Sequence, residues 1–338
     1  MAQQYASKQP QGYSNYLKTV AIVGVGGQVG KHIVENILKN GKQNVIALTR
    51  ADSKSAAPAG VEVRKIDYDN QQTIVDALQG VEALIITMAV TAPPEQQTKL
   101  IDAAAAASVP WVLPNEYGAA SNNEQLGKDT MLGPKAQGYR THIEELGESS
   151  WIGVACSFWY EYSLAVSPEA YGFDFAKKEV TFFGEGTAKI NTSTWPQTGR
   201  AVANLLALKV LPEDEHDKAP TLTGFKNRFI HVSSFLVSQR DMLDSVLRVT
   251  GGKEGDWKIT HEDCEERYKS GVEMLQSGNR MGFVRLLYTR VFYPNGDGNY
   301  EDKIGLDNEV LGLPKEDLDE WTKVATDMAA DRSWSQLG

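Results

Sequence analysis

The sequence is poor in cysteine, since only Cys156 and Cys264 occur among its 338 residues, far apart from each other. Two isolated thiols supply neither a disulfide framework nor the ligand spacing of a metal site. The five histidines share no metal-like spacing either, so we expect no bound metal. Two buried or idle thiols suit a reducing compartment, and we expect a cytoplasmic protein.

An excess of positive charge is also missing. Lys and Arg number 34 against 44 Asp and Glu, which gives a formal net charge of −10. This sign opposes the basic face that neutralises nucleic-acid phosphates, so we expect no nucleic-acid partner. The longest apolar run, residues 81–90, is about half the length of a membrane span and includes Glu82. We therefore expect no membrane insertion.

The first 18 residues lack the features of a targeting segment. They are polar, without the apolar core of a secretory signal or the Arg-rich amphipathic pattern of a transit peptide. We interpret residues 1–18 as a flexible arm. A chain of this length buries roughly three quarters of its unfolded surface on folding, which is ample for a large core.

What the sequence does contain is an alternation of strand-like and helix-like segments. Short apolar runs typical of buried parallel strands occupy residues 19–24, 44–49, 61–66, 83–87, 111–114 and 151–158. Apolar residues at helical spacing occupy residues 28–39, 72–80, 95–108 and 138–146. The alternation predicts an α/β fold with a Rossmann-type doubly wound parallel sheet.

The alternation fades after residue 158, where short strands, helices and aromatic-rich loops mix. We therefore expect an NAD(P)-binding domain over residues 19–158. Residues 159–338 are expected to form a smaller, interleaved α+β region that binds the substrate and covers the mouth of the sheet.

Three glycines mark the turn between the first strand and the first helix. Gly24, Gly27 and Gly30 stand three residues apart. Such glycines permit a tight turn, close approach of a pyrophosphate and close helix-to-strand packing. The first helical residues, Gln28 and Val29, then offer unpaired N–H groups to phosphates. In this setting the turn predicts dinucleotide binding.

The end of the second strand bears on which dinucleotide binds. An NAD enzyme places an acid about 20 residues after the last glycine, against the ribose 2′-hydroxyl. Here Arg50 takes that place and Lys54 follows, so a 2′-phosphate would meet positive charge. These charges favour NADP(H), although the acidic Asp52 lies between Arg50 and Lys54 in the sequence. The alternative is that Arg50 is only a solvated charge in a loop.

Further cofactor candidates follow the third and fourth strands. Asp67 is placed to accept a hydrogen bond from the adenine amino group and Tyr68 to line its face, with a plain turn as the alternative. Thr87 and Met88 stand where the fourth strand ends.

The usual motifs for the proton donor are absent. No Ser-His-Asp arrangement occurs in a plausible order, and no Tyr stands three residues before a Lys with a preceding Ser after the fourth strand. A reduction therefore requires another acid.

The glycine turn, Arg50, the phrase VLPNEYG at 112–118 and the helix from GYRTHIEELG together resemble the NmrA-like, isoflavone-reductase-like atypical short-chain dehydrogenases. The resemblance covers roughly residues 19–165 well and is nearest to the fungal CipA-like branch. Plant members reduce phenolic substrates with NADPH, whereas more distant relatives bind the dinucleotide as redox sensors. The resemblance thus implies NADP(H) binding.

The resemblance also implies site residues. VLPNEYG corresponds to a segment that borders the nicotinamide, which makes Asn115 and Tyr117 candidates. The plant enzymes carry a catalytic Lys four residues before an Arg; Arg140 matches the Arg, but Lys135 stands one residue too far back. A lysine desolvated beside the nicotinamide could move a proton. The alternative is that Lys135 is only an exposed charge on a loop. In that case Tyr117 and Tyr139 are the other candidate proton donors.

The segment CSFWYEYSLA resembles the family's stretch that brings an aromatic ring under the nicotinamide, here Phe158. By position, Trp159, Tyr160 and Tyr162 are candidates to line an aromatic substrate pocket, although aromatics are also common core residues. Segments 171–175 and 191–195 are the next expected pocket walls.

We therefore expect an NADPH-dependent reductase that transfers hydride to a carbonyl or conjugated carbon of an aromatic, phenolic or polyketide-like small molecule. We expect a monomer or a homodimer. One alternative is a non-catalytic NADP(H) sensor that binds a protein partner. Another is an isomerase or lyase that retains the fold without net redox change.

Overall fold

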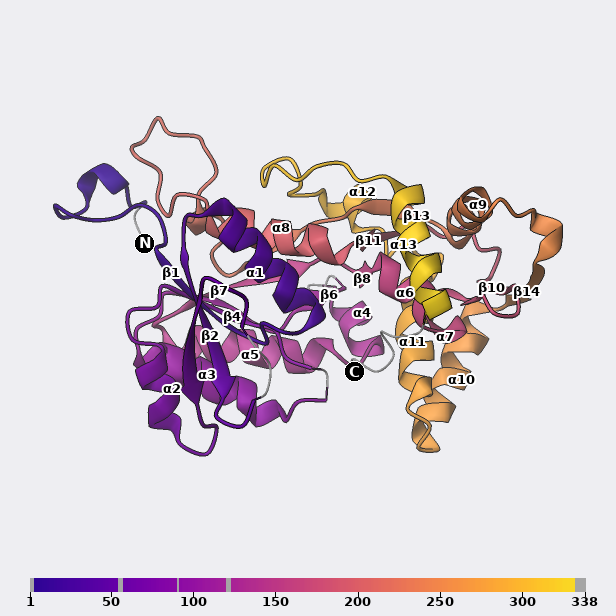
Figure 1. Ribbon diagram of the computed structural model, residues 1–338, viewed down its shortest axis with the longest axis horizontal. Coiled ribbons are helices and arrows are strands. Elements are labelled where there is room, and N and C mark those ends of the chain that lie inside the picture. Colours follow the sequence, from indigo (N-terminus) through magenta and orange to yellow (C-terminus); the bar gives the residue numbers. More distant parts are fainter. Residues whose placement is uncertain (1–2, 54–56, 90, 120–122, 332–338) are drawn as a thin grey trace.

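The computed structural model describes residues 3–53, 57–89, 91–119 and 123–331. Figure 1 shows two lobes, one built mainly by the first half of the chain and one mainly by the C-terminal half. Within the described residues, no helix is both long and apolar enough to cross a membrane.

The first lobe is centred on a parallel sheet, whose strands follow the order β3-β2-β1-β4-β5-β7-β12, with the short β6 beside β7. The strands are β1 (Thr19–Val23), β2 (Asn44–Arg50), β3 (Val61–Ile66), β4 (Ala83–Ile86), β5 (Trp111–Leu113), β6 (Tyr117–Gly118), β7 (Ser150–Ala155) and β12 (Arg228–His231). The last strand comes from the C-terminal half and pairs in parallel with β7. The smaller C-terminal region thus completes the sheet of the first lobe.

Helices cover both faces of this sheet (Figure 1). One face carries α1 (Gln28–Asn40) and α8 (Trp195–Leu206), and the other carries α2 (Gln71–Ala77), α3 (Pro94–Ala106) and α5 (Gly133–Leu146). Side chains of a strand alternate between faces, so Val20 and Ile22 join the first core and Ala21 and Val23 the second. The predicted doubly wound α/β fold is confirmed.

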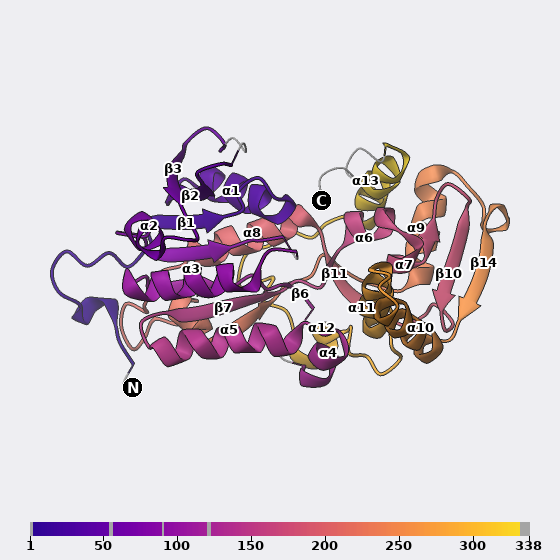
Figure 2. The ribbon, with the colours of Figure 1, turned by 90° about the horizontal axis from the view of Figure 1, so that it is seen from below.

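The C-terminal lobe contains two small three-stranded sheets, β14-β10-β9 and β13-β11-β8. Their strands are β8 (Phe158–Trp159), β9 (Phe173–Asp174), β10 (Glu179–Phe183), β11 (Ile190–Ser193), β13 (Phe235–Val237) and β14 (Lys258–Glu262). Figure 2 shows β10 and β14 at the end of the molecule away from β3. The predicted α+β character of this region is confirmed.

Helices pack around these sheets. They are α6 (Tyr160–Val166), α7 (Pro168–Tyr171), α9 (Gln239–Thr250), α10 (Cys264–Gln276), α11 (Met281–Val291), α12 (Tyr300–Ile304) and α13 (Leu318–Asp331). A third core holds fully buried rings that include Tyr171, Phe182 and Phe292. This lobe is therefore stabilised by a core of its own.

Residues 3–18, expected as a flexible arm, lie against the segment that follows α8. The short helix η1 (Ala6–Lys8) donates backbone hydrogen bonds to Pro212 and Glu213. Asn15 bonds in both directions with the chain near Leu211, and Leu17 is buried in the first core. These partners are distant in sequence, so no local pattern indicates them.

Candidate functional site

The glycine turn after β1 leaves no room for side chains. Gly24 has a φ of 87°, and a Cβ there would lie 1.8 Å from the carbonyl oxygen of Thr87. A Cβ on Gly30 would lie 2.1 Å from the carbonyl oxygen of Gly24. Glycine is required at both positions because the ends of β1, β4 and α1 meet here.

The N-terminus of α1 lies open beyond this turn. Its N-cap, Gly27, supplies no side-chain hydrogen bond to the first turn. The side-chain oxygen of Gln28 is buried and has no hydrogen-bond partner among the described residues, while Val29 is part of the core. The unpaired N–H groups of the first turn of α1, beside a glycine turn, fit the pyrophosphate of a dinucleotide.

The residues predicted at the ends of β4 and β5 lie beside the turn. Thr87 donates its hydroxyl to the carbonyl oxygen of Val23 at 2.7 Å. The side-chain amide of Asn115 accepts from the backbone N–H of Met88 and donates to its carbonyl, each at 3.1 Å. Asn115 thus holds the chain after β4 in place.

Basic side chains gather where β2 and β3 end. The side chain of Arg50 is 61% exposed, and its Nε lies 3.5 Å from a carboxylate oxygen of Asp52. Lys65, on the adjacent strand, donates to the carbonyl oxygen of Arg50 at 3.3 Å. Lys54 lies outside the described residues. Lys65 was not among the residues predicted from the sequence. It could have been found because Lys65 is near the end of β3, which was expected to pair in parallel beside β2.

The turn after β3 is held by its own side chains. A carboxylate oxygen of Asp67 accepts the backbone N–H of Asp69 at 2.9 Å, and the backbone N–H of Asp67 donates to Thr73. Tyr68 is half-buried, and this burial raises its pKa while Arg50 nearby acts to lower it. The contacts of Asp67 give it a role in the turn, and Tyr68 lies next to the basic end of β2.

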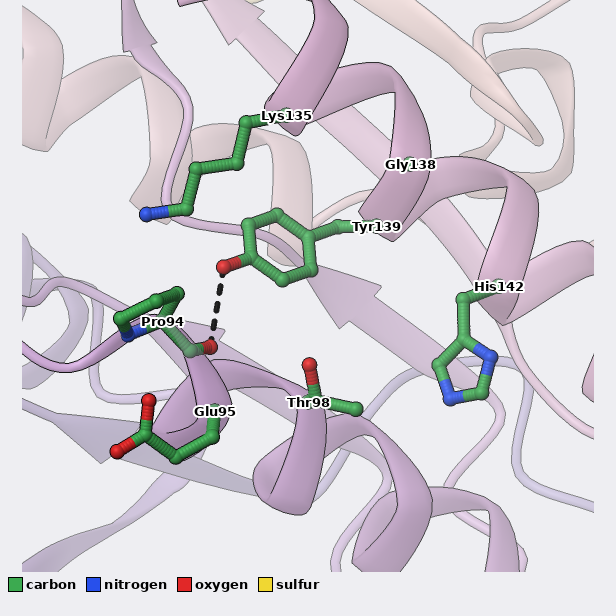
Figure 3. Close-up of a pocket in the computed structure, with 7 residues that line it drawn as sticks. All are labelled: Pro94, Glu95, Thr98, Lys135, Gly138, Tyr139 and His142. Carbon is green, nitrogen blue, oxygen red and sulfur yellow. Dashed lines mark hydrogen bonds between the residues drawn. The ribbon is translucent and has the colours of Figure 1, made fainter.

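Lys135 occupies an exposed place on α5. The stretch between the predicted strand at 111–114 and the predicted helix at 138–146 contains α4 (Glu124–Asp129) and the first turn of α5, which begins at Gly133-Pro134. In Figure 3, Lys135 and Tyr139 of α5 face Pro94 of α3 across a cleft of about 510 Å³. The Lys135 Nζ is 6.0 Å from the centre of the Tyr139 ring, and the Tyr139 hydroxyl donates to the Pro94 carbonyl. The desolvated setting that the sequence hypothesis assumed is absent here.

Arg140 packs inside the protein and contacts several neighbouring side chains. It is buried, forms an ion pair with Glu116, and places its guanidinium 5.3 Å from the ring of Trp151 and 5.0 Å from that of Phe229. This ion pair joins α5 to the segment between β5 and β6. The contacts favour a structural role over cofactor binding.

Two of the predicted ligand-contacting aromatics are core residues of the C-terminal lobe. Phe158 stacks on Tyr288 with 3.9 Å between ring centroids. Tyr160 is fully buried and its hydroxyl is hydrogen-bonded to that of Thr322 at 2.6 Å; burial raises its pKa well above the ordinary value. Both side chains are thus packed in the core of this lobe, and the contacts of Phe158 with the nicotinamide and of Tyr160 with the substrate stay predictions.

Trp159 and Tyr162 instead meet Trp195, the first residue of α8, in what we call the aromatic cluster. Ring centroids lie 6.4 Å apart for Trp159 and Tyr162, 6.1 Å for Trp159 and Trp195, and 5.6 Å for Tyr162 and Trp195. The cluster packs against the first core, and Trp159 and Tyr117 share Cys156 as a neighbour. The cluster therefore lies where the two lobes meet, at the carboxyl ends of the parallel strands.

Two buried acids adjoin the aromatic cluster. The Tyr117 hydroxyl is buried without a hydrogen-bond partner among the described residues, and burial raises its pKa far above the ordinary value. Glu161 is only 1% exposed; its Oε1 accepts the backbone N–H of Trp195 at 2.9 Å, and burial raises its pKa to about 8. Sequence reasoning missed Glu161, although a lone glutamate within FWYEYSL was the signal.

Comparison with known proteins identifies the family. The NmrA-like family matches residues 17–166. Oxidoreductase aprR of Aspergillus flavus is 30% identical over 304 residues, which cover 89% of this chain and 96% of that protein. The chain belongs to the NmrA-like family. It is an oxidoreductase of the isoflavone-reductase-like type, as the sequence resemblance predicted.

Solved structures support the fold of this NmrA-like protein. The structure of AtPrR2 with NADP⁺ and (+)-pinoresinol has a TM-score of 0.72 and 16% identity, covering 93% of this chain and 100% of that one. An isoflavone reductase structure has a TM-score of 0.70 and 19% identity, covering 90% and 98%. At such identities the likeness shows a shared architecture.

The geometry of the NmrA-like chain thus brings most predicted cofactor residues to one edge of the sheet. The glycine turn, Thr87, Met88 and Asn115 surround the N-terminus of α1, and Arg50 with Tyr68 lies where β2 and β3 end. Phe158, Tyr160 and Arg140 are drawn into packing instead.

Proposed function

We propose that this protein is an NADPH-dependent reductase that transfers hydride to a carbonyl or conjugated carbon of an aromatic, phenolic or polyketide-like small molecule. The observation that carries the proposal is the glycine turn, which has no space for a Cβ at Gly24 or Gly30 and opens onto the uncapped N-terminus of α1. We further propose that the protein is a member of the fungal CipA-like branch.

The preference for NADPH over NADH rests on the charges at the end of the sheet. Arg50 and Lys65 offer two cations where the adenine ribose would lie, and the carboxylate of Asp52 lies beside Arg50. A 2′-phosphate would form charge-assisted hydrogen bonds there. The similar AtPrR2 structure contains NADP⁺, which supports the same choice.

The substrate class rests on the aromatic cluster. Flat apolar rings that pack at 5–7 Å offer large surfaces to a second flat ring system. The AtPrR2 structure holds (+)-pinoresinol, an aromatic compound, which supports this class.

In the proposed reaction the bound cofactor supplies the hydride, and the protein supplies position and electrostatics. The backbone N–H groups of the first turn of α1, which begins at Gln28, would hold the pyrophosphate, and Asn115 would keep residues 87–88 against it. Burial of the aromatic cluster would exclude water from the reacting atoms. The proton donors predicted from the sequence are Lys135 and Tyr117.

The proposal is tested by titrating the purified protein with NADPH, then adding acetophenone, chalcone or naphthoquinone and following the absorbance of the reduced nicotinamide. We expect binding and oxidation with at least one compound. Binding without oxidation across a broad panel of aromatic ketones, enones and quinones would favour the sensor, and an absence of binding would overturn both.

Gly27→Ala provides a matched variant for the binding step. Gly27 has a φ of −75° that any residue adopts, and a Cβ would lie 3.3 Å from the Gly24 carbonyl oxygen. The fold should therefore persist, while the methyl group stands in the path of the pyrophosphate. We expect the dissociation constant for NADPH to rise by about tenfold or more, or 1.4 kcal/mol. An unchanged constant would place the cofactor elsewhere.

A further inference from the structure

Four buried polar atoms without an oxygen or nitrogen partner belong to neighbouring residues where the lobes meet. They are the Tyr117 hydroxyl, the indole nitrogens of Trp159 and Trp195, and Oε2 of Glu161, each judged within the described residues. The thiol of Cys156 is a neighbour of both Tyr117 and the Trp159 indole. Buried polar groups are nearly always satisfied in folded proteins, so such a grouping indicates a place where a ligand supplies the missing partners.

Glu161 is the acid of this group. It lies in the first turn of α6, and its Oε1 is held by the backbone N–H of Trp195, so the direction of the carboxyl is set. Oε2 is left without a partner among the described residues. A carboxyl group with one oxygen held by a hydrogen bond and the other without a partner can give a proton to a ligand.

The charges around Glu161 favour its neutral form. Burial is the main cause that raises its pKa to about 8, and the Glu316 carboxylate adds to it. Lys31 of α1 and the N–H groups that bond to the carboxyl act in the opposite direction. Glu316 is itself paired with Arg200 of α8, which weakens its effect. Near neutral pH the carboxyl therefore carries its proton.

The position of Glu161 connects it to the cofactor side of the site. Lys31 lies in the turn of α1 that follows Gln28, and α8 packs so closely on α1 that a Cβ at Gly199 would lie 2.5 Å from the His32 carbonyl. Glu161, which is bonded to Trp195 of the aromatic cluster, is thus a neighbour of the helix whose N-terminus is the proposed pyrophosphate site. A carbonyl compound stacked on the cluster would have its oxygen within reach of both lobes.

We propose that Glu161 is the proton donor of this reductase and that its Oε2–H binds the oxygen of an aromatic carbonyl substrate. The inference rests on the proposed function and names a residue in place of Lys135. Trp159 and Trp195 would donate their indole N–H groups to the same ligand, as fixed donors of an oxyanion-stabilising site.

The substrate carbon accepts the hydride, the π electron pair of the carbonyl moves to oxygen, and the Oε2–H bond of Glu161 breaks as the new O–H bond forms. The substrate is reduced, the nicotinamide cofactor is oxidised, and Glu161 is left as a carboxylate. Water returns a proton to Glu161 when the product leaves.

Glu161→Gln tests the step because the amide oxygen can still accept the Trp195 N–H while the side chain has no acidic proton. With whichever of acetophenone, chalcone or naphthoquinone the wild type reduces, we expect kcat to fall about 10²- to 10⁴-fold and the NADPH dissociation constant to stay within twofold. In the wild type, kcat/KM should fall as the pH rises through about 8, and this limb should vanish in the variant. Glu145→Gln, at an exposed position of α5, is the matched control and should behave as wild type.

Infrared spectroscopy separates this inference from the proposed function. Wild type without cofactor should show the band of a protonated carboxyl at neutral pH that shifts when acetophenone is added and is lost in Glu161→Gln. If no compound is reduced but the band is present and shifts, the reductase proposal fails and the binding role of Glu161 stands. Absence of the band, or full turnover in Glu161→Gln with loss in Lys135→Met, would overturn the inference.

Discussion

At the scale of single residues, the segment 158–162 divides its side chains between two environments. Phe158 and Tyr160 enter the core of the C-terminal lobe, whereas Trp159 and Tyr162 join the aromatic cluster. The chain changes here from strand to helix, so the side-chain period changes from two to about 3.6. Sequence order alone cannot say which side chains then share a face, and for this reason all four were predicted to contact ligand.

Arg50→Ala should weaken the binding of NADPH by about tenfold to a hundredfold and that of NADH much less. The reason is that Arg50, largely exposed at the end of β2, would lose its charge-assisted hydrogen bonds to a 2′-phosphate that NADH lacks. Dissociation constants for both dinucleotides, measured by calorimetry, check this. Arg280→Ala, an exposed arginine in the other lobe, is the control. An equal loss for the two dinucleotides would contradict the role of Arg50.

At the scale of elements, α1 depends on a helix that comes from the other half of the chain. α8 packs along α1, and Gly199 permits the close contact because any Cβ there would meet the backbone of His32. The sequence predicted α1 from its own periodicity. It offered no sign that residues 195–206 would cover the same face of the sheet, since that contact joins segments far apart in the chain.

Gly199→Val should lower the free energy of unfolding by about 1–3 kcal/mol or more, because the added side chain overpacks the interface between α1 and α8. Urea denaturation checks this. Gly138→Ala on α5 is the contrasting variant, since nothing lies within 4 Å of its added Cβ; it should raise stability by about 0.5–1 kcal/mol through helix propensity. Equal effects of the two variants would contradict the packing argument.

At the scale of the whole molecule, the two lobes are joined through the site. β12 returns from the C-terminal half to the sheet beside β7, and α6 places Glu161 against the start of α8. The acid is buried only because both lobes cover it. The stability of the fold is therefore linked to the protonation of the Glu161 carboxyl.

This linkage predicts a pH dependence of stability. The pKa of Glu161 is raised to about 8 in the folded protein, against about 4.3 for an unperturbed glutamate, so the folded state holds this proton more tightly. The contribution of Glu161 to stability is then greatest below about pH 4 and falls as the pH rises toward 8. The loss is on the order of several kcal/mol.

Urea denaturation of wild type and Glu161→Gln between pH 5 and 8 measures this contribution as a difference, which removes the effects of groups that both proteins share. We expect the stability of the variant relative to wild type to increase with pH. A constant difference across the range would contradict the raised pKa of Glu161.

The sequence by itself determined the dinucleotide-binding half. Strand burial, helical periodicity and the left-handed backbone at Gly24 are local properties, so the alternation of elements, the glycine turn and Arg50 at the end of β2 could all be predicted. The family resemblance extended this to an isoflavone-reductase-like oxidoreductase.

Only the tertiary structure decided which side chains are buried together. The exposed place of Lys135, the packing of Phe158, Tyr160 and Arg140, and the burial of Glu161 depend on atoms from segments that are distant along the chain. Burial, and the pKa shift that follows from it, is a property of the surrounding fold, which no spacing of residues encodes locally.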